Sequence, residues 1–340
     1  MTAFKAMVSV CVLAGLVAGT ANALNMETVP VGNAGNAADT EVMWPDGTTG
    51  YGGVAYDYRI GTYEVTAGQY CDFLNKTAAT DTYGLYSTNM DTAVYYLGCN
   101  IKRSGVSGSY TYTVASDWAN RPVNYVSWGD SARFSNWMHN GQPTGSQNAS
   151  TTEDGSYYLN GATSDEALQA VMRKANPTWV IPSDDEWYKS AYHKNDGVTG
   201  NYFDHPTSSD SVPSNVLGDP TDPGNNATYH NNGNTIGSPY YRTEVGAHEN
   251  SDSPYGTFDQ GGNVQEWNEA VIYGSLRGLR GGSFFDVDYG LRASFRNYGA
   301  PTFESSAALG FRVAEVPEAA TAGLFLLGGL PVARCRRAPR

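Results

Sequence analysis

Two carboxylates flank a glycine-rich turn in the last third of the chain. Asp259 precedes the turn Gly261-Gly262-Asn263, and Glu266 follows it. Negatively charged side-chain oxygens, together with backbone carbonyls that a turn exposes, are the hard ligands that Ca²⁺ takes in proteins. The turn therefore predicts a calcium site. The alternative is a tight turn before a strand, with both acids in solvent.

A second group of polar side chains follows another double glycine. Ser283 comes directly after it, and Asp286 and Asp288 stand two residues apart. This spacing places two side chains on one face of a strand, where they could share a hard cation. The alternative is two exposed acids on a loop. Ser283 would need a base to act as a nucleophile, but the five histidines show neither that placement nor metal-ligand spacing.

Three helix starts and several short strands would position these turns. Each helix start has the capping-box pattern, in which the cap oxygen and the third side chain satisfy opposing amide donors. Bulky apolar residues follow each pattern about one helical turn apart. The helix starts lie at 66–69, 127–130 and 183–186. Short strands are expected at 56–60, 63–65, 179–181, 279–280 and 310–313.

Composition limits the partners that the chain can have. Its 340 residues carry 34 acidic and 21 basic side chains, a net charge of −13, so no basic stripe is available for nucleic acid. Divalent cations suit such a surface better.

No 20–50-residue repeat and no linker divides the chain, which indicates one domain. Cys71 and Cys99 form either one disulfide, in an oxidising compartment, or two buried free thiols.

The two ends of the chain read as targeting segments. Residues 1–23 combine Lys5, an apolar stretch and the small-residue site Ala21-Asn22-Ala23, which predicts a secretory signal peptide. Residues 319–333 are apolar and four arginines follow them. This run is shorter than the ~20 residues of a stable membrane-spanning helix. The arginines would remain on the cytoplasmic side, so the segment indicates a weak C-terminal anchor.

Six motifs occur in an order that resembles one family. The most specific is the stretch 255–267, which contains Gly261-Gly262-Asn263-Val264-Gln265-Glu266-Trp267. The others are at 63–66, 122–128, 181–187, 279–284 and 308–312. Together they resemble the formylglycine-generating enzyme, or sulfatase-modifying factor, over almost all of residues 24–315. The resemblance implies an α+β domain with a C-type-lectin-like core and little regular secondary structure.

The resemblance also implies which residues bind calcium. Carried over by position, the first ligand set would be the side chains of Asp259 and Glu266 and the carbonyls of Gly262 and Val264. A second calcium would take Asn226 and the Ala227 carbonyl. Gln265 stands where the family usually has tryptophan, a change that removes an aromatic wall and no calcium ligand.

The family's oxidase chemistry requires two cysteine thiolates shortly after the Gly-Gly-Ser motif. They bind copper, and O₂ then oxidises a substrate cysteine. Here Asp286 occupies the first position, and the second falls on Gly290 or Leu291. Carboxylate and glycine do not replace soft sulfur ligands, so the sequence argues against copper and against this oxidation. The remaining candidates in the inherited cleft are Ser283, Asp286, Asp288, Arg292 and Arg296.

The C-terminal segment resembles a PEP-CTERM sorting signal. Val316-Pro317-Glu318, the short apolar segment and the basic end occur in that order within 316–340. The resemblance implies an exosortase-type partner, contact with the membrane during sorting, and delivery to the envelope, surface or extracellular matrix of a Gram-negative-type bacterium.

These features together predict an exported, calcium-stabilised domain without the copper pair. The leading hypothesis is a non-catalytic binding or structural module for a glycan or an exported protein, because aromatic faces with acid and amide groups suit such ligands. The alternative is an enzyme of altered chemistry in the same cleft.

Overall fold

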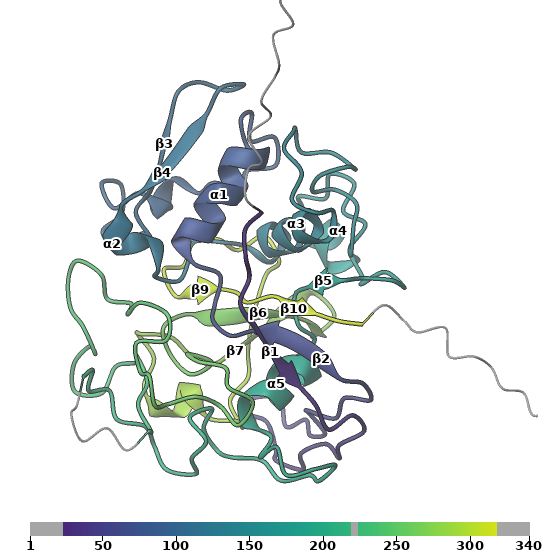
Figure 1. The fold of residues 1–340 in the computed structure, drawn as a ribbon, viewed down its shortest axis with the longest axis vertical. Coiled ribbons are helices and arrows are strands. Elements are labelled where there is room, and N and C mark those ends of the chain that lie inside the picture. The colour runs from purple at the N-terminus through teal and green to yellow at the C-terminus, as the bar shows by residue number, and fades with distance from the viewer. Residues whose placement is uncertain (1–22, 219–223, 318–340) are drawn as a thin grey trace, which may run out of the picture.

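The computed structural model describes residues 23–218 and 224–317. Three short sheets and a few helices are joined by long irregular segments (Figure 1). The helices are α1 (Ala67–Thr77), α2 (Ser116–Ala119), α3 (Trp128–His139), α4 (Asp165–Gln169) and α5 (Asp184–Tyr192), with 3₁₀ turns η1 (Thr88–Met90) and η2 (Asp288–Leu291). The expected α+β organisation with little regular secondary structure is confirmed.

Two four-stranded sheets form the middle of the molecule. The first has the order β1-β2-β10-β5 and the second β8-β7-β6-β9, while β3 and β4 form a separate hairpin. The strands are β1 (Thr28–Val31), β2 (Tyr58–Gly61), β3 (Ile101–Ser104), β4 (Thr111–Val114), β5 (Trp179–Val180), β6 (Gln265–Ile272), β7 (Leu276–Arg280), β8 (Asn297–Gly299), β9 (Leu309–Gly310) and β10 (Ala314–Glu315). Since β1 and β10 both pair with β2, the first and last strands lie on either side of β2 in the same sheet (Figure 1).

All three expected helix starts are confirmed. Thr66, Ser127 and Ser183 cap α1, α3 and α5, and in each the side chain of the third helical residue returns a bond to the cap amide. The helices α3 and α5 both pack on β6, which begins two residues after the Gly-Gly-Asn turn and carries Glu266. The turn is thus fixed by elements whose starts are encoded locally.

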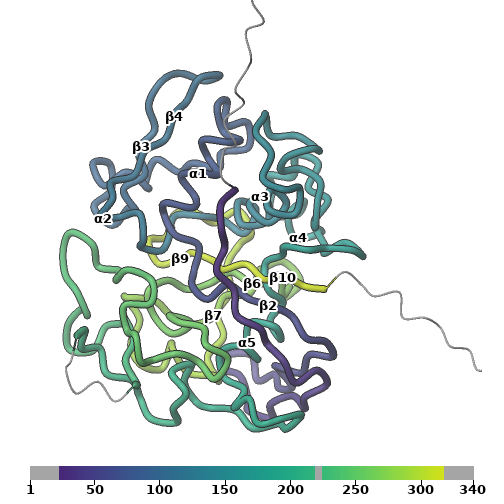
Figure 2. Tube along the Cα trace, viewed as in Figure 1, coloured from purple at the N-terminus to yellow at the C-terminus, as the bar shows by residue number. Residues whose placement is uncertain are grey.

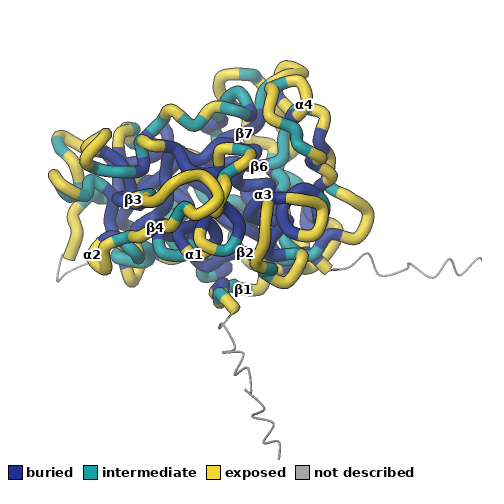
Figure 3. Tube along the Cα trace, turned by 90° about the horizontal axis from the view of Figure 1, so that it is seen from above, coloured by how far each residue is buried: buried dark blue, intermediate teal, exposed yellow. Residues whose placement is uncertain are grey.

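The core is built largely from aromatic rings. Phe134 of α3 contacts Tyr70, Phe73 and Phe311, with ring centroids 5.3–6.2 Å apart. Phe311 lies between β9 and β10, so it joins the two central sheets to the helices. Figure 3 shows that buried positions fill the interior and that exposed positions concentrate in the peripheral loops.

Two expected strands differ in the structure. Residues 63–65 are not a strand, because Val65 donates to Phe311 O and accepts from Val123, which lie on two different segments. Of the expected strand at 310–313, only Gly310 belongs to a strand, β9, which pairs with β6; residues 311–313 connect it to β10, which pairs with β2 and β5. In the described part of 193–264 the chain forms no helix and no named strand, as expected for 196–253 (Figure 2).

The cysteines and the two ends complete the comparison with the sequence. Cys71 and Cys99 are free, buried thiols in the described structure, and burial raises the pKa of Cys71 to about 12. The predicted signal peptide, except Ala23, and the apolar tail after Pro317 lie outside the described residues. No helix within 23–218 or 224–317 has the length and apolar character to cross a membrane.

Candidate functional site

The turn after Gly282 is closed by its own serine and aspartate. Asp286 Oδ2 accepts hydrogen bonds from the Ser283 amide at 2.8 Å and from the Ser283 hydroxyl at 2.7 Å. The backbone of Asp286 also donates to Ser283 O and accepts from His230 N. The serine hydroxyl is therefore hydrogen-bonded within the turn, and the Asp286 carboxylate accepts the bonds that hold the turn closed.

Two of the positions at which the resemblance implies copper-binding thiolates lie close together in the structure. A Cβ atom built on Gly290 would lie 3.0 Å from Asp286 Cβ, so positions 286 and 290 are adjacent. The backbone thus brings Asp286 close to Gly290, one of the two candidates for the second position, and neither Gly290 nor the other candidate, Leu291, carries a sulfur atom. No sulfur ligand is available there for copper.

Exposed aromatic residues surround this turn. Along 284–289, the side chains of Phe285, Val287 and Tyr289 are each between 42 and 48% exposed. Tyr289 contacts Trp44, which is 60% exposed, with ring centroids 6.0 Å apart. On the other side of the turn, Phe285 packs on Phe284.

The aromatic contacts continue away from the turn. Phe284 contacts Tyr241, which contacts Tyr96, at centroid distances near 6 Å. Tyr96 is 59% exposed. We call Trp44, Tyr96, Phe285 and Tyr289 the aromatic rim.

The two charged residues nearest the rim pair with each other. Arg292 Nη2 lies 2.7 Å from Asp288 Oδ2, and both side chains are exposed. An exposed pair of this kind contributes at most about 1 kcal/mol to stability, so it can exchange its partner for a ligand at little cost.

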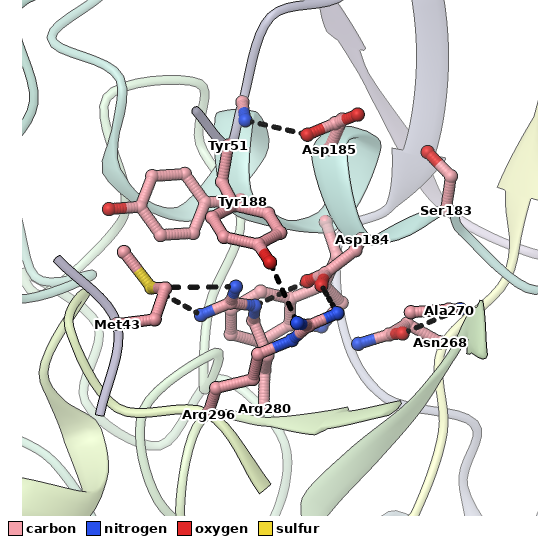
Figure 4. Close-up of polar contacts among 12 residues, drawn as sticks. Met43, Tyr51, Ser183, Asp184, Asp185, Tyr188, Asn268, Ala270, Arg280 and Arg296 are labelled. Atoms are coloured by element: carbon pink, nitrogen blue, oxygen red, sulfur yellow. Dashed lines mark hydrogen bonds and ion pairs between the residues drawn. The ribbon is translucent and has the colours of Figure 1, made fainter. Parts of the chain in front are cut away.

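Arg296, the last of the predicted cleft residues, lies in a buried ion cluster. Its guanidinium group donates to Asp46 at 2.9 Å and to the Tyr51 hydroxyl at 2.7 Å, and it pairs with Asp184 at 2.8 Å. Arg280 bonds the other oxygen of Asp184 (Figure 4). The structure therefore places Arg296 between the N-terminal loop and α5, where it holds these segments together.

Glu266, a predicted calcium ligand, has a protein cation as its partner. Arg312 donates to both of its carboxylate oxygens, at 2.6 and 2.7 Å, and Trp187 Nε1 donates at 2.7 Å. Glu266 and Arg312 are both fully buried. A carboxylate so paired is a weaker ligand for a second cation, since the guanidinium group already neutralises it.

Asp259 and Glu64 supply carboxylates beside this ion pair. Asp259 Oδ2 accepts from Gly246 N at 2.6 Å, and burial raises the pKa of Asp259 to about 6. Glu64 is 1% exposed, and among the described residues its carboxylate oxygens have no hydrogen-bond partner. Burial first, and then the charges of Asp259 and Glu266, raise the pKa of Glu64.

Neither Glu64 nor Arg312 was predicted as a site residue. Both lie in motifs on which the resemblance depends. A charged side chain among mostly uncharged neighbours in those motifs could have indicated a buried ionic group.

The remaining predicted ligands lie where two loops meet. Asn263 N donates to Thr228 O at 2.8 Å, and a Cβ atom on Gly262 would lie 2.2 Å from that oxygen, so only glycine fits. This contact brings the Gly262–Val264 turn against the loop of Asn226 and Ala227. Within the described residues, no three His, Cys, Asp or Glu side chains are placed to share a metal. Calcium binding by Asp259 and the carbonyls of Gly262 and Val264 therefore stays a prediction.

A family comparison accounts for these motifs. The sulfatase-modifying factor enzyme 1-like domain matches residues 20–316, which is most of the chain. The chain belongs to this family. The described turns at 259–266 and 281–291 contain no cysteine in this sulfatase-modifying-factor-like domain.

Comparison with solved structures finds similar folds at low identity. CarF is 17% identical, with a TM-score of 0.46, over 86% of this chain and 98% of that one. Treponema denticola variable protein 1 is 18% identical, with a TM-score of 0.48, over 85% and 95%. PvdO from Pseudomonas aeruginosa is 18% identical, with a TM-score of 0.45, over 85% and 93%. These values assign no role to individual residues. No curated protein matches the sequence.

Proposed function

We propose that this sulfatase-modifying-factor-like domain is a glycan-binding module. The supporting observation is the aromatic rim around a turn that contains no cysteine. Rings that are half exposed, and held by contacts with other rings, can stack on the C–H faces of sugars with little loss of side-chain entropy. Asp288 and Arg292 stand within the same surface and can bond hydroxyl groups.

The hydrogen bond that the Ser283 hydroxyl already makes favours a binding function over an enzyme of altered chemistry. A nucleophilic serine needs a neighbouring base that takes its proton in the reaction. Ser283 is buried and bonds Asp286, which also holds the Ser283 amide. The hydrogen bonds between Ser283 and Asp286 account for the shape of the turn, and no catalytic role is needed to explain them.

Retention on immobilised glycans tests the proposal. The domain would be passed over a panel of neutral bacterial polysaccharides, and Phe285→Ala and Tyr289→Ala would be compared with wild type. Each stacked ring contributes ~0.5–1.5 kcal/mol, so each change should weaken binding roughly two- to tenfold. Phe303→Ala is the matched control, because Phe303 is 44% exposed and lies outside the rim. Retention of an exported protein but of no glycan would overturn the proposal.

We further propose calcium as a stabilising ion and the cell surface as the destination. Asp259 with the carbonyls of Gly262 and Val264 supplies oxygens for calcium, and Glu266 would be shared with Arg312. Asn226 and Ala227 remain the proposed second site. Export through the leader 1–23 and exosortase-type sorting through 316–340 are tested by fractionating cells that express the full chain or a chain ending at Glu315.

A further inference from the structure

A polar cavity lies beside the backbone segments that carry Trp44 and Tyr289 of the aromatic rim. It has a volume of about 270 Å³ and lies between the segment 204–212 and the residues that follow η2. Its wall includes Glu41, Asp204, His205, Asp210, Arg292 and Ser294. Most sites for drug-sized ligands have volumes of ~300–1,000 Å³, so this cavity suits a smaller group, of about one sugar ring.

His205 is the least satisfied polar group in this wall. The side chain is 2% exposed, and neither ring nitrogen has a hydrogen-bond partner among the described residues. Burial, followed by the charge of Arg292, lowers the pKa of His205, so the ring is neutral at pH 7. A neutral imidazole offers one donor and one acceptor. Buried polar groups are normally satisfied, so this ring indicates a ligand.

The charged groups around His205 restrict what the ligand can be. Asp204, Asp210 and Glu41 are acceptors, and Arg292 is a donor whose partner Asp288 is exposed. The three carboxylates disfavour an anion, and two of the charged groups in the wall already have a partner, because Asp210 pairs with Lys194 and Arg292 with Asp288. An uncharged ligand with many hydroxyl groups can donate to the acids and accept from Arg292.

The rim continues directly from the cavity wall. Trp44 N donates to the carbonyl of Ser294 at 2.7 Å, and Arg292 N donates to Tyr289 O. Trp44 and Tyr289 therefore stand on the segments that form the cavity. A polar cavity with exposed rings at its edge matches a sugar, which has hydroxyl edges and apolar faces.

We propose that this cavity is the subsite that seats one neutral sugar ring of the glycan, with Trp44 and Tyr289 stacking on the neighbouring part of the ligand. The inference rests on the proposed function and adds the substrate class and the specificity-determining residues Asp204, His205 and Arg292.

Saturation-transfer NMR with methyl glucoside, galactoside and mannoside tests the subsite. At least one glycoside should receive saturation from the wild-type domain. Asp204→Asn and Arg292→Ala should each weaken its binding about tenfold or more, since each removes a charge-assisted hydrogen bond. His205→Phe should abolish binding while it keeps a ring in the cavity. Asp72→Asn, an exposed change on α1, is the matched control and should have no effect.

The outcomes separate the subsite from the glycan-binding proposal. If polysaccharide retention depends on Phe285 and Tyr289 but not on Asp204 or Arg292, the subsite is wrong and glycan binding stands. If CaCl₂ alone binds with the same sensitivity to Asp204→Asn, the cavity is a cation site and the subsite is again wrong. If the wild-type domain retains no polysaccharide and binds no glycoside, both proposals fall. Arg292 is exposed, so Arg292→Ala remains informative if His205→Phe does not fold.

Discussion

Replacing Arg312 by methionine should destabilise the domain more than any surface change. Arg312 makes two hydrogen bonds to Glu266 and also donates to the carbonyls of Gly61, at 2.9 Å, and Phe258, at 2.8 Å. Without it, Glu266 remains fully buried with Trp187 Nε1 as its donor, beside the carboxyls of Glu64 and Asp259.

The expected loss follows from the uncompensated charge. Removing one partner of a buried ion pair costs ~3–5 kcal/mol, whereas an exposed pair contributes at most about 1 kcal/mol. Arg312→Met should therefore lower the free energy of unfolding by about 4 kcal/mol and the melting temperature by about 10 °C. Lys174→Met is the control, since Lys174 pairs with Asp154 at 2.6 Å with both side chains exposed.

Urea unfolding at pH 7 measures the effect, with calcium and again with EDTA. Glu266→Gln in the Arg312→Met background should restore part of the lost stability, because it removes the buried charge. Calcium should restore part of it only if the ion binds Glu266. A loss below 1 kcal/mol for Arg312→Met, equal to that for Lys174→Met, would refute the reasoning.

Three further results are expected. Burial raises the pKa of Asp130 to about 6, although Ser127 bonds it. Between about pH 4 and pH 6 the folded state holds a proton that the unfolded state lacks, so stability should fall by about 3 kcal/mol as the pH rises through that window. Asp130→Asn should reduce the fall in stability across that window by about 3 kcal/mol in urea titrations at several pH values, and the part that Asp259 contributes, whose pKa is also raised to about 6, should remain. EDTA should lower the melting temperature of the wild-type domain if Asp259 holds calcium, and an unchanged midpoint would contradict the calcium proposal. Incubated with copper, O₂ and a cysteine peptide of the sulfatase type, the domain should leave the peptide mass unchanged beside an active control enzyme, and loss of the thiol mass would contradict the role assigned to position 286.

The sequence by itself determined the helix starts and the two glycine turns. The capping bonds of Thr66, Ser127 and Ser183 join residues only three positions apart, so the local pattern contains both partners. Gly262 is similar, because its backbone conformation and close approach to Thr228 require glycine. The absence of cysteine at Asp286, Gly290 and Leu291 also follows from the sequence alone, since it depends only on residue identity.

Only the tertiary structure decided which charges became partners. Glu266 is paired with Arg312, 46 residues away, and Arg296 with Asp46, 250 residues away. Such pairs depend on how the sheets bring distant segments together, and nothing in the local spacing favours one partner over another. The same holds for the cavity around His205, whose walls come from three segments far apart in the chain. The sequence showed which side chains could bind, and packing fixed which of them remain free to do so.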